Sequence, residues 1–336
     1  MAVIWQPTQV SSPHIAKPVE CIAAKYITYT EGGHRFETLH IYVPKTSATT
    51  NLVGKPATSI PELGKQSSKP RCHVHIHGGA WRDPFLTADS VEPLVACAFS
   101  SKDSPIDVIV GINYTLSPFP THPTAPYDPE KGDTGQPWRE AKHPDHVRDA
   151  LMAFRMLRSM GLADDQYLLS GHSCGACIAF QTILQDPKHW NLNEDLPAPP
   201  RAYALIGLNG LYDLDTLVNG LGPAHKSMRH EYEMFQSIAF GKDKSQWSEY
   251  SPARFDADMI SRSIEDGLAP KRIVLDQSTE DQLVPVNQLE RLKIQLEQVS
   301  GLQLWQGNRC AGSHAAPWEQ GYMIWQTILD VLEKAD

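Results

Sequence analysis

A serine between two glycines follows a short apolar run near the middle of the chain. The segment Gly171-His172-Ser173-Cys174-Gly175 comes after the apolar residues 167–169 and matches the pattern G-x-S-x-G. Where this pattern joins a strand to a helix, the bend is sharp and the serine hydroxyl stands clear of the backbone. Glycines suit the two flanking positions because a side chain would crowd so tight a bend. The spacing predicts that Ser173 is a nucleophile.

A second glycine pair follows an earlier apolar run, well before Ser173. It lies in the segment HGGAW, at residues 77–81. Glycines allow backbone N–H groups to face an oxygen that becomes negatively charged, and one such donor is worth about 3 kcal/mol in a transition state. We therefore expect an oxyanion hole formed by Gly78, Gly79 and the backbone N–H of Cys174.

A serine nucleophile needs a histidine base, and the base needs a carboxylate that orients it. Of the histidines after Ser173, only His314 lies in a short glycine-containing loop after the last predicted strand. The acid should stand between serine and histidine in the chain. Asp281 is our choice because it follows the predicted strand at residues 273–276. Glu280 and Asp276 stay open as alternatives, since spacing does not separate neighbours within one loop.

The elements that must position these residues alternate between strands and helices. Parallel strands are predicted at residues 72–77, 107–112, 167–172, 202–208, 273–276 and 302–305, and helices at 144–161, after Ser173, at 286–299 and at 318–334. Residues 24–29 and 36–43 predict antiparallel edge strands, 44–70 a surface loop, and the proline-rich 117–129 an irregular segment. Such alternation predicts a mostly parallel central sheet with helices on both faces. Together with the G-x-S-x-G turn and the chain order of serine, acid and histidine, it predicts the α/β-hydrolase fold, with a small helical cap. We expect a single domain over residues 1–336, with the cap at about 211–262.

Charge and composition restrict the partners. The net charge of −9 argues against nucleic acid and against anionic membranes. The sequence lacks an apolar run of roughly 18 residues and an evident signal peptide, so we expect a cytoplasmic protein with reduced cysteines. A homodimer is compatible with the sequence.

Other histidines, cysteines and acidic residues are better explained by structural roles than by chemistry. His73, His75 and His77 alternate along a strand, and we expect hydrogen-bonded structural histidines there and no metal site. Cys174 and Cys177 form C-x-x-C inside the helix after Ser173, where close packing explains them better than redox chemistry. We expect Asp149 and residues 231–233 to lie on solvated or helix-capping surfaces.

Five segments together resemble the kynurenine formamidases, particularly the fungal ones. They are HGGAW, the GHSCGA turn, NYTLSP, EDQLVP and GSHAAPW, and the likeness spans roughly residues 70–335. The resemblance implies hydrolysis of N-formyl-L-kynurenine to L-kynurenine and formate through a formyl-enzyme, without a cofactor. It assigns the triad to Ser173, Asp281 and His314 and the oxyanion loop to Gly78 and Gly79.

Substrate recognition is less defined by the sequence. Trp81, Tyr114 and Phe119 are candidate aromatic walls for an aryl substrate, and core packing is an equal alternative. A short-chain carboxylesterase could carry the same motifs. A catalytically inactive hydrolase-fold receptor is the alternative from another class.

Overall fold

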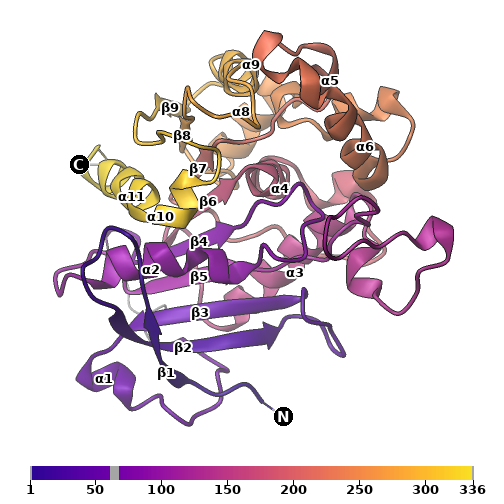
Figure 1. Cartoon of the computed structure of the whole chain (residues 1–336). Coiled ribbons are helices and arrows are strands. Elements are labelled where there is room, and N and C mark those ends of the chain that lie inside the picture. The colour runs from indigo at the N-terminus through magenta and orange to yellow at the C-terminus, as the bar shows by residue number, and fades with distance from the viewer. Residues whose placement is uncertain (1, 61–67, 335–336) are drawn as a thin grey trace.

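The strands build one sheet through the whole molecule. The computed structural model describes residues 2–60 and 68–334 (Figure 1). Within these residues the sheet has nine strands in the order β1-β2-β3-β5-β4-β6-β7-β8-β9. Their bounds are β1 Gln6–Val10, β2 Val19–Thr28, β3 Thr38–Pro44, β4 Cys72–Ile76, β5 Val108–Ile112, β6 Tyr167–His172, β7 Ala204–Leu208, β8 Arg272–Asp276 and β9 Gln303–Gln306.

The sheet is mostly parallel, as predicted. Strands β1, β2, β3 and β5 pair antiparallel, and every pairing from β5 through β9 is parallel. The predicted edge strands correspond to β2 and β3, whereas β1 was not predicted. Only Val10 of β1 is buried, so its sequence QPTQV carries no apolar alternation that could have revealed it.

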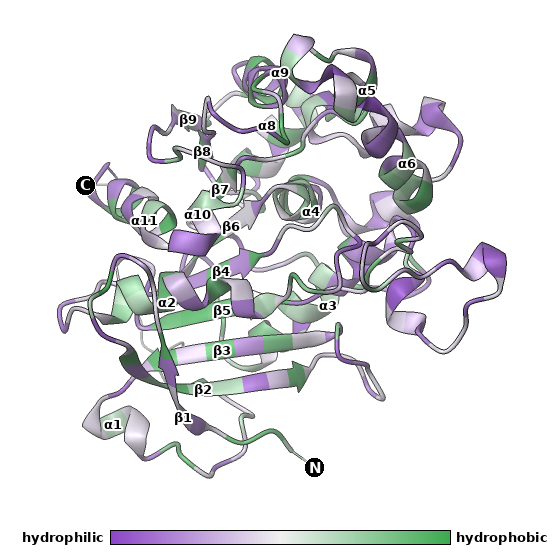
Figure 2. Cartoon of the chain, viewed as in Figure 1, coloured by the Kyte–Doolittle hydropathy of each residue, from purple (hydrophilic) through white to green (hydrophobic). Residues whose placement is uncertain are grey.

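Helices cover both faces of the sheet. Helices α3 (Asp145–Ser159), α4 (Cys174–Leu184), α8 (Ala257–Glu265) and α9 (Asn287–Leu296) contribute to one apolar cluster, and α2 (Glu92–Phe99) and α11 (Tyr322–Lys334) to the other. Successive strand residues alternate between them, with Leu169 in the first cluster and Leu168 in the second. Burial on both faces explains the mostly hydrophobic β5 in Figure 2.

Some predicted boundaries were wrong. The closing helix is two helices, α10 (Ala316–Gln320) and α11, because Gly321 between them has φ +68° and packs against the backbone of Pro93 and Leu94. A Cβ at Gly321 would lie 2.2 Å from the Leu94 nitrogen, so no other residue fits there without a shift. Helix α2 was missed, and the predicted loop at 44–70 contains the short α1 (Ser47–Thr50). Residues 61–67 of that loop lie outside the described residues.

Short helices occupy the segment predicted as a cap. They include α5 (Thr216–Asn219), α6 (Arg229–Phe240) and α7 (Trp247–Tyr250), and Figure 1 shows α5 and α6 together at one end of the molecule. Short 3-10 helices complete the described fold at Ala88–Val91, Pro129–Lys131, Pro137–Arg139, Pro187–Trp190, Pro223–Met228, Lys244–Gln246 and Pro252–Arg254.

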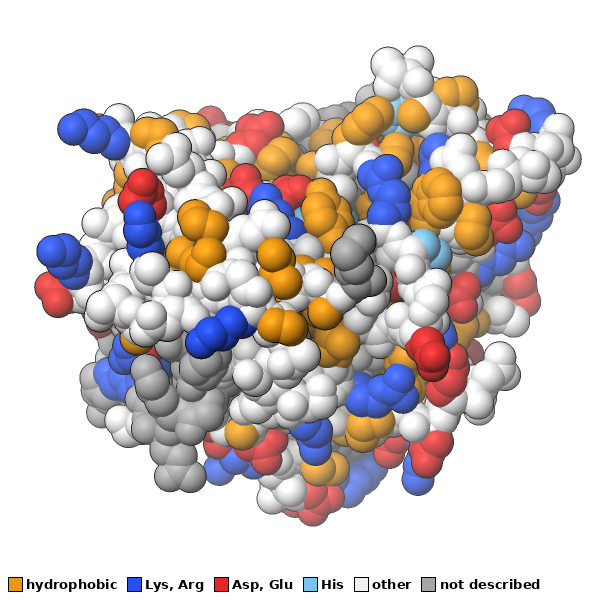
Figure 3. Space-filling model, turned by 90° about the horizontal axis from the view of Figure 1, so that it is seen from below, with side chains coloured by type: hydrophobic (Ala, Val, Ile, Leu, Met, Phe, Trp, Pro, Cys, Tyr) orange, Lys and Arg blue, Asp and Glu red, His pale blue; other side chains and the backbone are white. Residues whose placement is uncertain are grey.

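The surface mixes charges of both signs. On the face seen in Figure 3, acidic and basic side chains are interspersed. Among residues 2–60 and 68–334, no helix has both the length and the apolar character needed to cross a bilayer.

Candidate active site

Ser173 stands on a sharp turn between β6 and α4. Its backbone has φ +56° and ψ −125°, a conformation that costs on the order of 1–3 kcal/mol for a residue with a side chain. The backbone N–H of Ser173 donates to the Leu208 carbonyl at 3.0 Å, which ties the turn to β7. A Cβ at Gly171 would lie 2.3 Å from the Gly175 oxygen, and one at Gly175 would lie 2.2 Å from the Ile76 oxygen. Both flanking glycines are therefore required by close backbone approach.

His314 and Asp281 meet through a short hydrogen bond. Nδ1 of His314 lies 2.7 Å from Oδ2 of Asp281. The other Asp281 oxygen accepts from the backbone N–H groups of Leu283 and Val284, each at 2.8 Å. Ser173 and His314 line the same cavity, so the structure brings all three predicted residues to one place. The arrangement can hold the imidazole ring in one orientation.

The two alternative acids lie elsewhere in the same loop system. Glu280 accepts from the backbone N–H of Gly312 at 2.9 Å. Asp276 accepts from the backbone N–H of Arg309 at 2.8 Å and of Cys310 at 3.3 Å, and burial raises the pKa of its carboxyl. These carboxylates fix the ends of the loop that carries the histidine, while Asp281 contacts the histidine ring.

The backbone of His314 is held by side chains that the sequence did not reveal. Its carbonyl accepts from Nε2 of His172 at 2.8 Å and from Nδ2 of Asn209 at 3.1 Å, and its N–H donates to Gln282 at 3.0 Å. Burial keeps the pKa of His172 well below its ordinary value, so this ring acts as a neutral donor. His172 lies inside the G-x-S-x-G motif, and that place was the available signal.

The glycine loop predicted as an oxyanion hole packs against the serine. A Cβ at Gly78 would lie 3.1 Å from the Ser173 Cβ and 2.9 Å from Nδ1 of His172. Gly79 has φ +106° and lines the cavity. Cys174 begins α4, and its sulfur lies 3.2 Å from the backbone N–H of Trp81. The structure therefore brings Gly78, Gly79 and Cys174 close to Ser173.

Two of the three aromatic residues that were candidates for contacting the substrate are buried in the packing around that loop. Tyr114 is fully buried, and its hydroxyl lies 3.0 Å from the Gly78 carbonyl and 3.1 Å from the His77 carbonyl. Trp81 is also fully buried, with its ring packed against Phe235 and Phe240. Phe119 is the candidate that lines the cavity. For Trp81 and Tyr114 the structure therefore favours the packing alternative.

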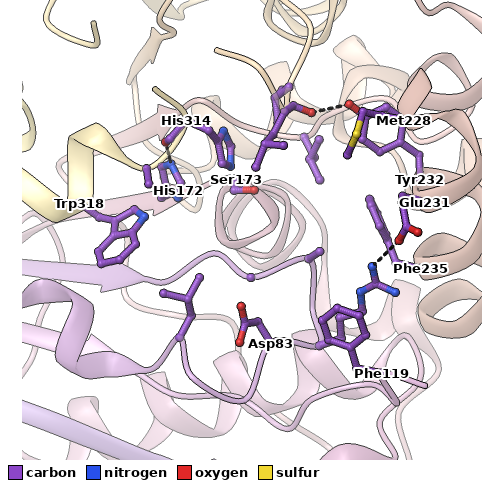
Figure 4. Close-up of a pocket in the computed structure, with 18 residues that line it drawn as sticks. Asp83, Phe119, His172, Ser173, Met228, Glu231, Tyr232, Phe235, His314 and Trp318 are labelled. Atoms are coloured by element: carbon purple, nitrogen blue, oxygen red, sulfur yellow. Dashed lines mark hydrogen bonds and ion pairs between the residues drawn. The ribbon is translucent and has the colours of Figure 1, made fainter. Parts of the chain in front are cut away.

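The cavity beside Ser173 has a volume of about 310 Å³ and mixes apolar walls with a few charges. In Figure 4, Ser173, His172 and His314 lie on one side, and Glu231, Phe235 and Phe119 lie across from them. The lining residues are Gly79, Ala80, Arg82, Asp83, Leu86, Phe119, His172, Ser173, Leu211, Met228, Glu231, Tyr232, Phe235, Leu283, Val284, His314, Ala315 and Trp318.

A charged pair in this wall was missed by the sequence analysis. Nη2 of Arg82 lies 3.2 Å from Oε2 of Glu231, whose side chain remains 44% exposed. The expectation that residues 231–233 form a solvated face is wrong for Tyr232, which is buried. The same expectation is wrong for Asp149, which is buried and accepts from the Thr115 N–H at 2.7 Å. For Arg82, the available signal was its place directly after HGGAW.

The alternating histidines of β4 are hydrogen-bonded, as predicted. His73 and His75 share the Ser170 hydroxyl, at 2.9 Å and 2.7 Å. Burial lowers the pKa of His75 to about 3, which keeps the ring neutral. Across the described part of the chain, no group of three or more His, Cys, Asp or Glu side chains has the geometry of a metal site.

Comparison with known sequences points to one family of enzymes, although no protein-family model matches the chain. A kynurenine formamidase-like hydrolase of Fusarium equiseti is 34% identical over 233 residues, 68% of this chain and 68% of the relative. A kynurenine formamidase of Aspergillus versicolor is 30% identical, over 67% of this chain and 75% of the relative. A kynurenine formamidase of Meyerozyma guilliermondii is 31% identical, over 65% and 68%.

Solved structures establish the fold. A truncated carbohydrate esterase from gut microbiota superimposes with a TM-score of 0.59 at 16% identity, covering 93% of this chain and 95% of the other. Esterase B from Lactobacillus rhamnosis gives a TM-score of 0.57 at 15% identity, covering 93% and 84%. Together with the mostly parallel sheet, these likenesses show that the chain has the α/β-hydrolase fold.

Proposed function

This chain belongs to the kynurenine formamidase family of hydrolases, and from that premise we propose that it cleaves N-formyl-L-kynurenine to L-kynurenine and formate with Ser173, His314 and Asp281 as its catalytic triad. The observation that carries the proposal is the 2.7 Å contact between His314 and Asp281, beside a serine on a strained turn and within one cavity. Apolar walls from Phe119, Phe235 and other side chains suit an aryl substrate.

The first half of the reaction transfers the formyl group to the serine. Oγ of Ser173 attacks the formyl carbon while the free imidazole nitrogen of His314 takes the hydroxyl proton. Asp281 holds the Nδ1–H of His314 and stabilises the imidazolium that forms. The carbonyl oxygen becomes an oxyanion, for which the backbone N–H groups of Gly78, Gly79 and Cys174 are the proposed donors.

Breakdown of the tetrahedral intermediate releases the amine. His314 returns its proton to the nitrogen as the C–N bond breaks, and the aromatic amine leaves. A water molecule then attacks the formyl ester of Ser173, with His314 again accepting a proton. Formate departs and the serine oxygen regains its proton. The formyl carbon carries only hydrogen, so the acyl side of the site can be small.

The substrate class is tested by comparing an amide with an ester. We expect kcat/KM for N-formyl-L-kynurenine to exceed that for p-nitrophenyl acetate by more than about tenfold, a difference of about 1.4 kcal/mol in transition-state stabilisation. Steady-state kinetics on the same enzyme preparation measure both values. A preference below that level would indicate a short-chain carboxylesterase, and no turnover of either substrate would indicate an inactive hydrolase-fold receptor.

Tyr114 is expected to matter as a residue that positions the oxyanion loop. Tyr114→Phe removes the hydroxyl that contacts the Gly78 carbonyl and leaves the ring packing intact. Loss of one buried hydrogen bond of about 1–1.5 kcal/mol should lower kcat for N-formyl-L-kynurenine by roughly tenfold, with little change in KM. Stopped assays over a range of substrate concentrations separate the two constants. An equal rise in KM would instead assign Tyr114 to substrate binding.

A further inference from the structure

Arg82 stands out in the cavity as a buried cation with unused hydrogen-bond donors. Its side chain is only 7% exposed, and it lines the same cavity as Ser173. Nη2 donates to Glu231 at 3.2 Å, while among residues 2–60 and 68–334 no group accepts from Nε or Nη1. Burial lowers the pKa of Arg82, yet a guanidinium keeps its charge in proteins. A buried charged group with unpaired donors is costly, so this one calls for a ligand.

The rings of Phe119 and Phe235 fix the plane of the Arg82 guanidinium and limit the directions from which a ligand can approach it. Its guanidinium carbon lies 3.8 Å from the centre of the Phe119 ring and 5.4 Å from that of Phe235. Stacking on an aromatic face leaves the N–H edge of the guanidinium as the part that can receive a ligand. Nη1 and the second N–H of Nη2 point the same way at the end of the guanidinium, and this fork matches the two oxygens of a carboxylate.

Acidic side chains complete the surroundings of this cation. Glu231 extends from α6 with its side chain 44% exposed, and Asp83 lines the cavity with its side chain 33% exposed. Both can accept from an ammonium group, whereas a carboxylate would be repelled from them and drawn to Arg82. This pattern of one cation beside two anions is complementary to the zwitterionic head of an α-amino acid.

We propose that Arg82 binds the carboxylate of the substrate's α-amino acid group, with Glu231 facing its ammonium group, so that the cavity selects aryl formamides that carry an amino acid side chain. This assignment rests on the proposed function, because it concerns the same cavity and the same reaction. It explains why a site with mostly apolar walls contains a buried guanidinium. A neutral ester or a simple aryl formamide would leave the Arg82 donors unpaired.

The test compares two formamides that differ only in the amino acid group. One is N-formyl-L-kynurenine, and the other is 2-formamidoacetophenone, which keeps the ring and ketone and lacks the charged head. In the wild type we expect kcat/KM to favour the first by more than about tenfold, because charged hydrogen bonds are lost with the second. Equal values for the two substrates would overturn the inference without any variant.

Substitution then assigns the preference to one residue. Arg82→Met keeps an unbranched apolar stem and removes every donor, and should lower kcat/KM for N-formyl-L-kynurenine on the order of 10²-fold. The value for 2-formamidoacetophenone should fall much less, by no more than about threefold. Arg82→Lys keeps the charge without the fork and should recover part of the loss. The matched control is Arg155→Met, at an exposed position of α3, which should change neither value.

Different results would refute the formamidase function and the role of Arg82 in binding the carboxylate. If the wild type hydrolyses neither formamide, the proposed function is wrong. If the wild type hydrolyses both but Arg82→Met and Arg82→Lys lose both activities in equal proportion, or lose neither, the formamidase assignment survives and the role of Arg82 is refuted.

Discussion

Replacing Ser173 by alanine is expected to lower kcat for N-formyl-L-kynurenine by roughly 10⁶-fold, the loss typical when a triad nucleophile is removed. The hydroxyl is the only group on this turn that can form the formyl ester, and α4 and the glycine loop hold it in place. KM should change little, because the cavity walls remain. Formate release, measured at enzyme concentrations high enough to detect a slow residual rate, gives the comparison.

The control is the same substitution, serine to alanine, at a serine that lies outside the cavity. Ser159→Ala, at the exposed end of α3, should keep wild-type activity. Thermal unfolding of all three proteins checks that they are folded. A Ser173→Ala enzyme that retained more than a few per cent of wild-type kcat would show that a different nucleophile acts.

Asp281→Asn is expected to lower kcat by roughly 10⁴-fold, since an amide in this place favours the wrong tautomer of the histidine. The remaining amide oxygen can still accept from the N–H groups of Leu283 and Val284, so the loop should keep its shape. The loss would therefore arise at the 2.7 Å contact with His314. Single-turnover kinetics with N-formyl-L-kynurenine would show slow formation of the formyl-enzyme.

The neighbouring carboxylate provides the matched comparison. Glu280→Gln retains an oxygen that can accept from the Gly312 N–H, and we expect it to reduce kcat by less than about tenfold. If Glu280→Gln lost as much activity as Asp281→Asn, Glu280 would share the role of orienting acid. If Asp281→Asn were nearly as active as the wild type, the triad assignment would fail.

Residues whose chemistry depends on local sequence could be predicted well. The turn at Ser173 requires a glycine two positions before it and another two positions after it, and both glycines can be read directly from the sequence. The parallel strands were recognisable because both of their faces are buried, as in β5. The choice between Asp281 and Glu280 could not be made from spacing, since both stand in one loop and only the fold shows which of them contacts His314.

Features that depend on distant contacts were not predictable. Arg82 and Glu231 are 149 positions apart, and they meet only because α6 folds over the cavity. Trp81 and Tyr114 are aromatic residues that could line an aryl site, yet both are fully buried. Asp149 has the charge of a surface residue, yet it is buried and accepts a hydrogen bond from the backbone of Thr115. In each case, tertiary packing determined the burial and the contacts of the residue, which its type alone did not predict.

Covalent labelling of Ser173, measured together with formate release, tests whether this serine is the nucleophile that cleaves the formamide. The enzyme is titrated with a fluorophosphonate probe, and at each step the remaining formate release from N-formyl-L-kynurenine is measured beside the fraction of the Ser173 peptide that carries the label. We expect formate release by the unlabelled enzyme, and a linear loss that reaches zero when Ser173 is fully labelled. Ser173 would not be the nucleophile of a formamidase if formate release persisted on fully labelled enzyme, if the loss accompanied labelling at another residue, or if the unlabelled enzyme released no formate.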